Sequence, residues 1–153
     1  MKRISKYVSY LEATKSNTAL KNGIDNTPNE KQLSNMKKVA VNVFDEVREH
    51  FGVPIGVSSF FRSLKLNKKI GGASKSDHMD GEAIDIDADM YGGVTNRQIF
   101  DYIKDNLEFD KLIWEFGSDE EPSWVHVSYV EGNNRKMVMR SIRKNGKTNY
   151  VFV

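Results

Sequence analysis

The sequence predicts an α+β fold in which N-terminal helices pack on an antiparallel sheet. Two observations lead to this prediction. Apolar residues recur at helical spacing early in the chain and at strand spacing through most of the rest. The later strand-like segments are joined mainly by short connections, which is typical of antiparallel hairpins. A length of 153 residues suits a single domain spanning 1–153.

The helical part begins with a weakly patterned segment and continues into a long amphipathic helix. Residues 4–22 carry weak helical periodicity and the turn-like NGIDNTP follows, so 1–27 is expected to be a helical extension packed on the domain. Pro28 suits a first helical turn, Thr27 is a candidate N-cap, and Gly52 is placed to end the helix. One apolar face repeats at three- and four-residue steps: Leu33, Met36, Ala40, Val43, Val47 and Phe51.

The rest of the chain is predicted to be mainly strands. A Gly- and Ser-containing loop over 65–78, with room for a short helix before Gly71-Gly72, follows the first strand. Thr95 is expected to cap a second helix over 96–106. Segments rich in β-branched and aromatic residues, or alternating in polarity, mark the strands: 53–61, 82–89, 111–116, 124–130 and two arms of a closing hairpin around Asn145-Gly146.

Composition narrows the classes of function. The chain has no cysteine, so any metal must be held by histidine and carboxylate. A net charge of +2, with Lys and Arg dispersed along the chain, is too small to make nucleic acid the main ligand. No stretch approaches the roughly 18 apolar residues of a membrane span. The basic N-terminus develops no apolar run, so we expect cytoplasmic synthesis without a signal peptide.

The segment SDHMDGEAIDID, residues 76–87, places one of only three histidines beside five carboxylates. Ile84 and Ile86 need the core, so strand alternation sends Asp85 to the opposite face. His78 lies just upstream, beyond a turn that a glycine permits. A histidine and a carboxylate are therefore expected to converge from a loop and a strand.

A second histidine follows the same logic. In the strand over 124–130, Val125 and Val127 share one face and His126 lies on the other. If this strand neighbours the earlier one, His126 and Asp85 face the same cleft. Two histidines and one carboxylate with an open fourth position would make a plausible catalytic zinc site.

Simpler interpretations of these residues remain open. A lone strand histidine is often a partly buried hydrogen-bonding residue. His50 lies near the end of a surface helix, where a protonated ring suits the helix dipole, so it is not a candidate ligand. Asp87 is either a rim acid or a support for a ligand. The remaining acids of the segment and the nearby Asp89 are expected to form a solvated rim: Asp77, Asp80, Glu82 and Asp89.

These residues also form a recognisable pattern. Ser76 to Asp85 has the form S-x-H-x-x-G-x-A-x-D and resembles the zinc D-Ala-D-Ala peptidase family. The segment 124–128, WVHVS, is similar to the later W-x-H strand of that family, and Ser59 to Ser63, SFFRS, resembles the approach to its first ligand. The likeness covers nearly the whole chain and is to the short domains found in phage and bacterial cell-wall lytic proteins.

The resemblance implies a single domain with the hedgehog/DD-peptidase-like fold and assigns roles to particular residues. Arg62 would hold the substrate carbonyl or the developing oxyanion, although a surface salt bridge is the alternative. Ser76 would hydrogen-bond the substrate, although it also suits a hydroxyl that supports the loop. Trp124 would line the substrate cleft. One zinc ion would have three protein ligands: His78, Asp85 and His126.

The sequence position expected for the general base differs from the pattern common in the family. Many relatives carry an acidic residue three positions before the last histidine, and here that position is Ser123. Glu115 is the preferred candidate, because a charge between two aromatic residues in an apolar strand is costly unless it is used. Relatives of the short type also carry W-E or I-E at this point. Glu120 and Glu121, in the following loop, are the alternatives.

The resemblance implies a monomeric zinc peptidase that hydrolyses peptidoglycan stem peptides, as a DD-carboxypeptidase or an endopeptidase. It would act on the bacterial cell wall, as a holin-released phage endolysin, a virion-carried lysin or a bacterial remodelling enzyme. The main alternative is a non-catalytic peptidoglycan-binding or virion structural module that keeps the fold, and Ser123 is the residue that keeps this alternative open. A protein with an acidic rim and no metal site is the third possibility.

Overall fold

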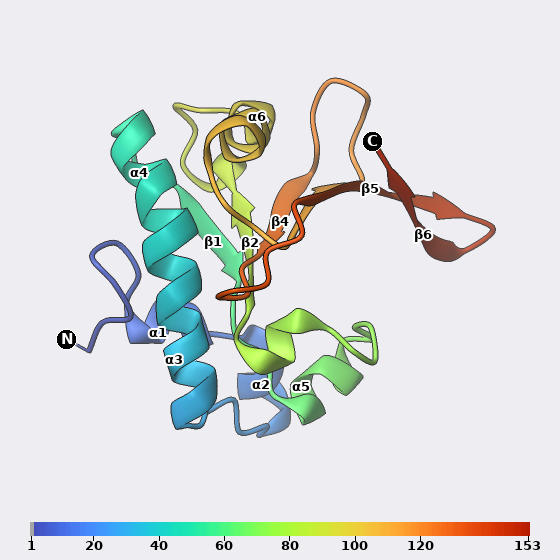
Figure 1. The fold of residues 1–153 in the computed structure, drawn as a ribbon. Coiled ribbons are helices and arrows are strands. Elements are labelled where there is room, and N and C mark those ends of the chain that lie inside the picture. The colour runs from blue at the N-terminus through green and yellow to red at the C-terminus, as the bar shows by residue number, and fades with distance from the viewer. Residues whose placement is uncertain (1) are drawn as a thin grey trace.

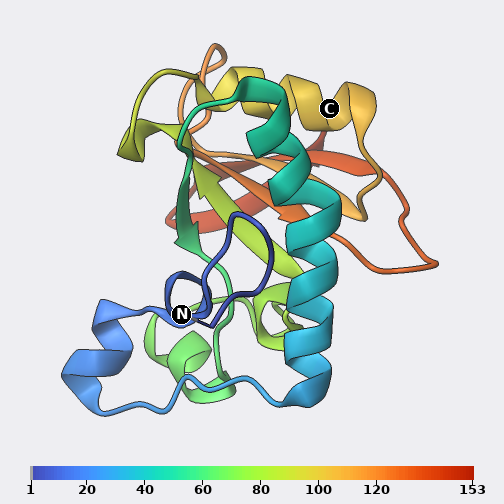
Figure 2. The same cartoon turned by 90° about the vertical axis from the view of Figure 1, so that its left-hand side faces the viewer.

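A long segmented helix covers one face of a six-stranded sheet within residues 2–153, the part of the chain that the computed structural model describes (Figures 1 and 2). Helices and a mostly antiparallel sheet confirm the predicted α+β class. The strand order is β1-β2-β4-β3-β5-β6. The strands are β1 (Gly56–Ser59), β2 (Ala83–Asp87), β3 (Lys111–Glu115), β4 (Trp124–Ser128), β5 (Met137–Lys144) and β6 (Lys147–Phe152).

One strand pair departs from the antiparallel prediction. β3 and β5 pair in parallel, because β4 already has β2 and β3 on its two edges and the returning chain must take the free edge of β3. Asp110 holds this return in place. Its carboxylate accepts hydrogen bonds from the backbone N–H of Arg135 at 3.1 Å and from the guanidinium of the same residue at 2.7 and 2.9 Å.

The long helix runs through three segments: α3 (Glu30–Val39), a π-helical stretch η1 (Ala40–Phe44) and α4 (Asp45–Phe51). Its predicted apolar face is largely buried, and Gly52 ends it with φ of 66°. The predicted cap at Thr27 is wrong. Asn29 is the N-cap, because its side chain accepts from the N–H of Gln32 while the Gln32 side chain accepts from that of Asn29. Pro28 therefore lies outside the helix.

Shorter helices surround the sheet. They are α1 (Tyr10–Thr14), α2 (Asn17–Asn22), α5 (Leu64–Lys69), η2 (Asp77–Asp80), η3 (Ala88–Met90) and α6 (Asn96–Asn106). Thr95 caps α6 as predicted, with Gln98 completing a capping box. In the expected extension 1–27, described from residue 2, α1 lies beside the end of β1, where Phe61 N donates to Ala13 O at 3.0 Å. β1 is shorter at both ends than the predicted strand over 53–61, and after it the backbone of Phe61 bonds to α1 instead of to a strand.

The two faces of the central strands have different roles. The face toward the helices is apolar and fully buried, with Ile84 and Ile86 of β2 opposite Val127 and Val125 of β4. The other face carries the polar residues, and Asp85 lies opposite His126. The β5–β6 hairpin projects from the body beside this second face (Figure 1). Within residues 2–153, no helix is long and apolar enough to span a membrane.

Candidate active site

Three side chains from separate segments meet on the polar face of the sheet. His78 comes from η2, Asp85 from β2 and His126 from β4. Each offers a ligand atom, and these atoms lie within 4.8 Å of one another. Two neighbouring strands and one short helix therefore bring together the three residues that the sequence motifs singled out.

His78 is held by its backbone and by its own ring. The Ser76 hydroxyl accepts from the His78 N–H at 3.3 Å and caps η2, and Gly81 ends η2 with φ of 73°. A side chain at Gly81 would meet the carbonyl oxygen of Gln32 at 2.5 Å, so only glycine fits. The ring Nδ1 lies 2.6 Å from the carbonyl oxygen of Phe60, which makes Nδ1 the protonated nitrogen.

The opposite ring nitrogen of His78 is left free for a ligand. Nε2 is buried and lies 3.3 Å from Oδ2 of Asp85, but it is not aligned for a hydrogen bond and has no other partner in the described chain. A buried lone pair without a donor is costly in a protein interior. The N–H donated to a backbone carbonyl is the usual support of a metal-ligating histidine. Both features fit a metal at this point.

Asp85 and His126 complete the set of donors. His126 Nδ1 lies 3.0 Å from Asp85 Oδ1. Burial by itself would raise the pKa of Asp85, but the electrostatic attraction of the adjacent His78 and the hydrogen bond with His126 outweigh it and lower the pKa. Burial would lower the pKa of His126, yet the carboxylate of Asp85 reverses the shift and raises it. A carboxylate kept ionised between two imidazoles fits a divalent ion such as zinc.

Glu115 lies on the same face of the sheet, in β3. The residue is 7% exposed, and its Oε2 accepts a hydrogen bond from the hydroxyl of Ser141 at 2.5 Å. Burial raises the pKa of the Glu115 carboxyl, although the Ser141 hydrogen bond and the charge of His126 oppose the shift. A carboxyl with a raised pKa beside a candidate metal centre has the properties of a general base.

Arg62 enters the cleft from the segment after β1. One terminal nitrogen donates to the Ser76 hydroxyl at 3.2 Å, while its buried Nε lacks a hydrogen-bond partner among residues 2–153. Burial lowers the pKa of the guanidinium, although the negative charges of Asp85 and Glu115 oppose the shift. Arg62 forms no ion pair in the described part of the chain, so the alternative interpretation as a surface salt bridge is wrong.

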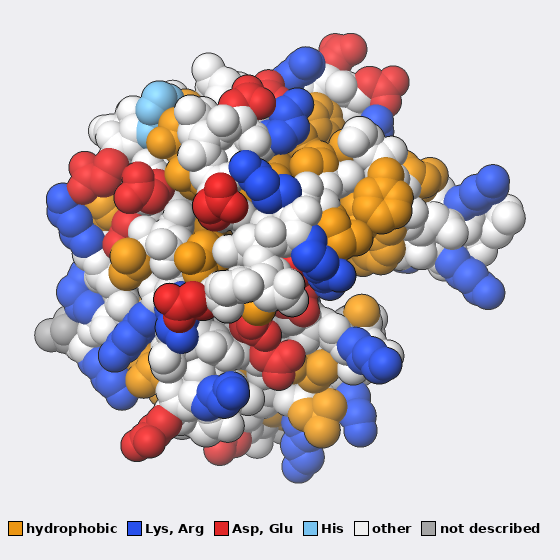
Figure 3. All heavy atoms as spheres, viewed as in Figure 1, with side chains coloured by type: hydrophobic (Ala, Val, Ile, Leu, Met, Phe, Trp, Pro, Cys, Tyr) orange, Lys and Arg blue, Asp and Glu red, His pale blue; other side chains and the backbone are white. Residues whose placement is uncertain are grey.

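A cleft of about 990 Å³ contains all of these groups and also Trp124, whose ring centroid lies 5.5 Å from that of Phe116. Its floor is the polar face of β3 and β4. The loop 70–75 and the β5–β6 hairpin contribute to its walls. In the space-filling view the molecule is hollowed between the projecting hairpin and the lobe below it (Figure 3).

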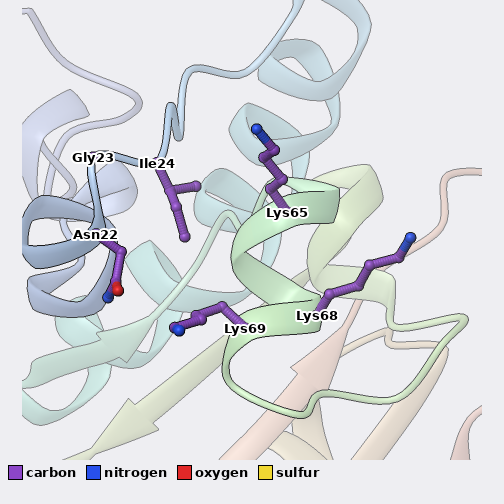
Figure 4. A pocket seen from close by; sticks show the side chains of 6 residues that line it. All are labelled: Asn22, Gly23, Ile24, Lys65, Lys68 and Lys69. Carbon is purple, nitrogen blue, oxygen red and sulfur yellow. The ribbon is translucent and has the colours of Figure 1, made fainter.

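A separate hollow of about 490 Å³ lies between α2 and α5. Its charged groups are three exposed lysines of α5, and Lys69 extends toward Asn22 while Lys68 points away (Figure 4). The ammonium groups diverge and the hollow contains no acid or nucleophile. We assign it no catalytic role.

The other acids considered from the sequence are engaged elsewhere. Glu121 accepts from the N–H of Arg97 at 2.8 Å and so supports the start of α6. Glu120 is an exposed loop residue. Asp87 accepts from the N–H of Asp89 at 3.0 Å and from the side chain of Asn96 at 3.2 Å, so its contacts among residues 2–153 organise the turn that leads into α6.

The expected solvated rim is only partly correct. Asp80 and Asp89 are exposed, whereas Asp77 is half-buried and pairs with Lys111 at 3.1 Å inside the cleft. His50 lies outside the cleft, with its ring stacked on Tyr102 at 4.0 Å.

The contribution of the C-terminal hairpin was missed at the sequence level. Residues of β5 and β6, including Arg143 and Tyr150, line the cleft, and Ser141 holds Glu115. The period-two pattern of 137–144 was the available signal, since it places Ser141 and Arg143 on one face. It did not reveal which strand lies beside β5. β4 follows β3 in the sequence, but β5 is the strand that pairs with the other edge of β3.

The comparisons with known proteins agree with this geometry. The family model for Peptidase M15 matches residues 6–128, a span that contains the three clustered donors, Arg62 and Glu115. The match ends with β4 and leaves out the β5–β6 hairpin. No curated protein sequence matches the chain significantly. The chain therefore belongs to the Peptidase M15 family of zinc D-Ala-D-Ala peptidases, as its motifs predicted.

Proposed function

We propose that this chain is a zinc peptidase that hydrolyses a peptide bond in peptidoglycan stem peptides. The single observation that carries the proposal is the cluster of His78, Asp85 and His126, with ligand atoms within 4.8 Å, in a cleft that also holds the buried Glu115. A bound zinc ion would polarise the scissile carbonyl and lower the pKa of a coordinated water. Membership of a peptidase family supports the reaction type.

In this proposal Glu115 moves the proton. It accepts a proton from the attacking water and later returns one to the leaving amine. Its raised pKa, caused mainly by burial, brings its proton affinity closer to neutral pH than that of an ordinary glutamate. Ser141 occupies Oε2, which leaves Oε1 for the cleft.

Arg62 and Trp124 would bind the substrate. The Arg62 guanidinium is anchored through Ser76 and can donate to the carbonyl oxygen as negative charge develops on it. Trp124 lies directly across from Glu115 in the β3–β4 pair, so its ring flanks the proposed reaction centre. Ser76 contributes by holding Arg62 and capping η2, whichever groups of the substrate it also contacts.

The substrate and the site of action follow from the family resemblance. Stem peptides containing D-amino acids are the expected substrates, for DD-carboxypeptidase or endopeptidase activity. We propose that the protein works as a monomer on the bacterial cell wall after cytoplasmic synthesis, as an endolysin, a virion-carried lysin or a remodelling enzyme. The cleft is open at one side, between the hairpin and the loop 70–75, which suits a polymer-linked peptide.

A non-catalytic module is the second candidate. The observation that favours it is Ser123, which stands where many relatives carry an acid and is exposed. The raised pKa and burial of Glu115 in the cleft favour catalysis instead, because a carboxyl in that environment is costly unless it is used.

Peptidoglycan hydrolysis tests the proposal. Wild-type protein should reduce the turbidity of purified peptidoglycan, and chelator or His126→Ala should abolish this activity. His50→Ala is the matched control, because His50 stacks on Tyr102 outside the cleft and its loss should leave activity unchanged. Mass spectrometry of the released muropeptides identifies the bond that is cut.

Metal content separates the alternatives. A protein that carries stoichiometric zinc but releases no muropeptide would contradict catalysis and support the binding or structural module. A protein purified without chelators that carries no stoichiometric metal would favour the third possibility, an acidic-rim protein without a metal site.

A further inference from the structure

The β5–β6 hairpin lies outside the residues that match the family model, yet it borders the cleft. The match ends at residue 128, and β5 begins at Met137. β5 pairs in parallel with β3, and this register places Ser141 directly beside Glu115. The hairpin therefore brings one buried hydroxyl against the proposed general base.

Ser141 is completely buried, and its hydroxyl can donate in one direction only. The N–H of Phe116 donates to Ser141 Oγ at 3.2 Å and to the Ser141 carbonyl oxygen at 3.1 Å. A serine hydroxyl has a single proton, and an ionised carboxylate only accepts, so the proton of Ser141 points to Glu115 Oε2 at 2.5 Å. Hydrogen bonds to charged groups are among the strong ones.

This contact limits the freedom of the Glu115 side chain. Holding Oε2 against β5 restricts rotation of the carboxyl group and leaves Oε1 toward the cleft, where a water would be activated. Without Ser141 the carboxyl group would lose its fixed orientation and its one hydrogen-bond donor in the described chain.

We propose that Ser141 is a positioning residue that orients Glu115 for proton transfer, so that a strand beyond the family-matched segment completes the active site. This inference rests on the proposed function, in which Glu115 is the general base.

A purely structural role for Ser141 predicts a different outcome. Phe116 has φ of 51°, a left-handed conformation that costs energy in a residue other than glycine, and Ser141 accepts from its N–H. If Ser141 only supports this turn, removing its hydroxyl should lower stability without a specific effect on turnover.

Ser141→Ala should lower kcat by about tenfold, the kinetic equivalent of one hydrogen bond to a charged group, with KM and zinc content little changed. Ser128→Ala is the matched control. Ser128 is also a fully buried serine of the same sheet, and its hydroxyl accepts from the N–H of Lys111 at 3.0 Å without contacting Glu115. It should lose comparable thermal stability and keep kcat within about twofold of wild type. Ser141→Thr, which keeps the hydroxyl, should recover most of kcat.

An NMR titration, which does not depend on catalytic turnover, complements the kinetic measurements. The 13C NMR titration of the Glu115 carboxyl carbon should move to higher pH in Ser141→Ala, because the lost hydrogen bond favoured the ionised form. The other charged or titratable groups that face Glu115 are unchanged in the variant: Arg62, Asp85, His126 and Tyr150.

The outcomes separate the inference from the function. If Ser141→Ala and Ser128→Ala have the same kcat, or if the Glu115 titration does not move, the positioning role is overturned while the peptidase function stands. If wild type hydrolyses nothing, the proposed function fails, and the titration alone then decides whether Ser141 controls Glu115. If Ser141→Ala does not fold, Ser141→Cys, of similar volume and weaker donor strength, should show the same loss of kcat.

Discussion

Two buried carboxylates of the cleft, Asp85 and Glu115, lie on one face of one sheet but experience opposite environments. Both are buried, and burial alone would raise the pKa of each. Two imidazoles surround Asp85 and lower its pKa, whereas the main contact of Glu115 is a single neutral hydroxyl and its pKa stays raised. One environment favours a permanent anion and the other favours a group that exchanges a proton.

This difference assigns separate roles to two parts of the site, a ligand end that would bind the metal and a proton-transfer end. Pairs of titratable groups driven apart in pKa are a general sign of separate catalytic roles. The ligand end is built from the contiguous motif around Asp85 together with His126 of the neighbouring strand. The proton-transfer end combines Glu115 of β3 with Ser141 of β5. The predictions below test whether the two ends can be disrupted separately.

Disrupting the ligand end should have the largest effect. Asp85→Asn keeps the shape of the side chain but removes the charge between His78 and His126, so zinc binding and hydrolysis should both fall to background. Elemental analysis and muropeptide release measure the two quantities in the same preparation. Stoichiometric zinc in this variant would show that Asp85 is not a ligand.

Disrupting the proton-transfer end should leave the metal in place. Glu115→Gln should retain stoichiometric zinc while kcat falls by about 10²–10⁴-fold, the range for loss of a general base. The control variants are Glu120→Gln and Glu121→Gln, whose side chains lie away from the cleft and should have near wild-type activity. Activity that survives in Glu115→Gln but disappears in one of the loop variants would move the base to that loop.

The pH dependence of kcat/KM should reflect the ionisation of Glu115 and not that of Asp85. Glu115 must be ionised to accept a proton, so kcat/KM should fall about tenfold per pH unit below its pKa, which is raised above the usual value of about 4.3. The pKa of Asp85 is lowered, so this carboxylate stays ionised throughout that range. Zinc content should stay constant across the acid limb. An acid limb that follows the release of zinc would instead indicate protonation of a ligand such as His126.

Removing the Ser76 hydroxyl should have the smallest effect. Ser76 caps η2 and holds Arg62, so Ser76→Ala should lower the free energy of unfolding by about 1 kcal/mol, as typical for a lost N-cap. Chemical denaturation measures this loss, and substrate titration shows whether KM changes by only a few-fold. A large rise in KM with unchanged stability would make Ser76 primarily a substrate contact, as the family resemblance implies.

Several features of this protein were determined by local sequence. The alternation of Ile84, Asp85 and Ile86 sent the carboxylate away from the core, because side-chain direction in a strand depends only on position along it. The same rule placed His126 on the polar face of β4. The family motifs are equally local, and the α+β class followed from the amphipathic long helix and the strand-like segments after it.

Other features were decided only by the tertiary structure. The helix cap went to Asn29 instead of Thr27, because two reciprocal hydrogen bonds with Gln32 outweighed a plausible single cap. The position of Ser141 beside Glu115 depends on the pairing of β5 with β3. β2 and β3 fill both edges of β4, so the second edge of β3 is the one that accepts β5. Strand neighbours are set by competition among distant segments for sheet edges, and periodicity along the chain carries no information about that choice.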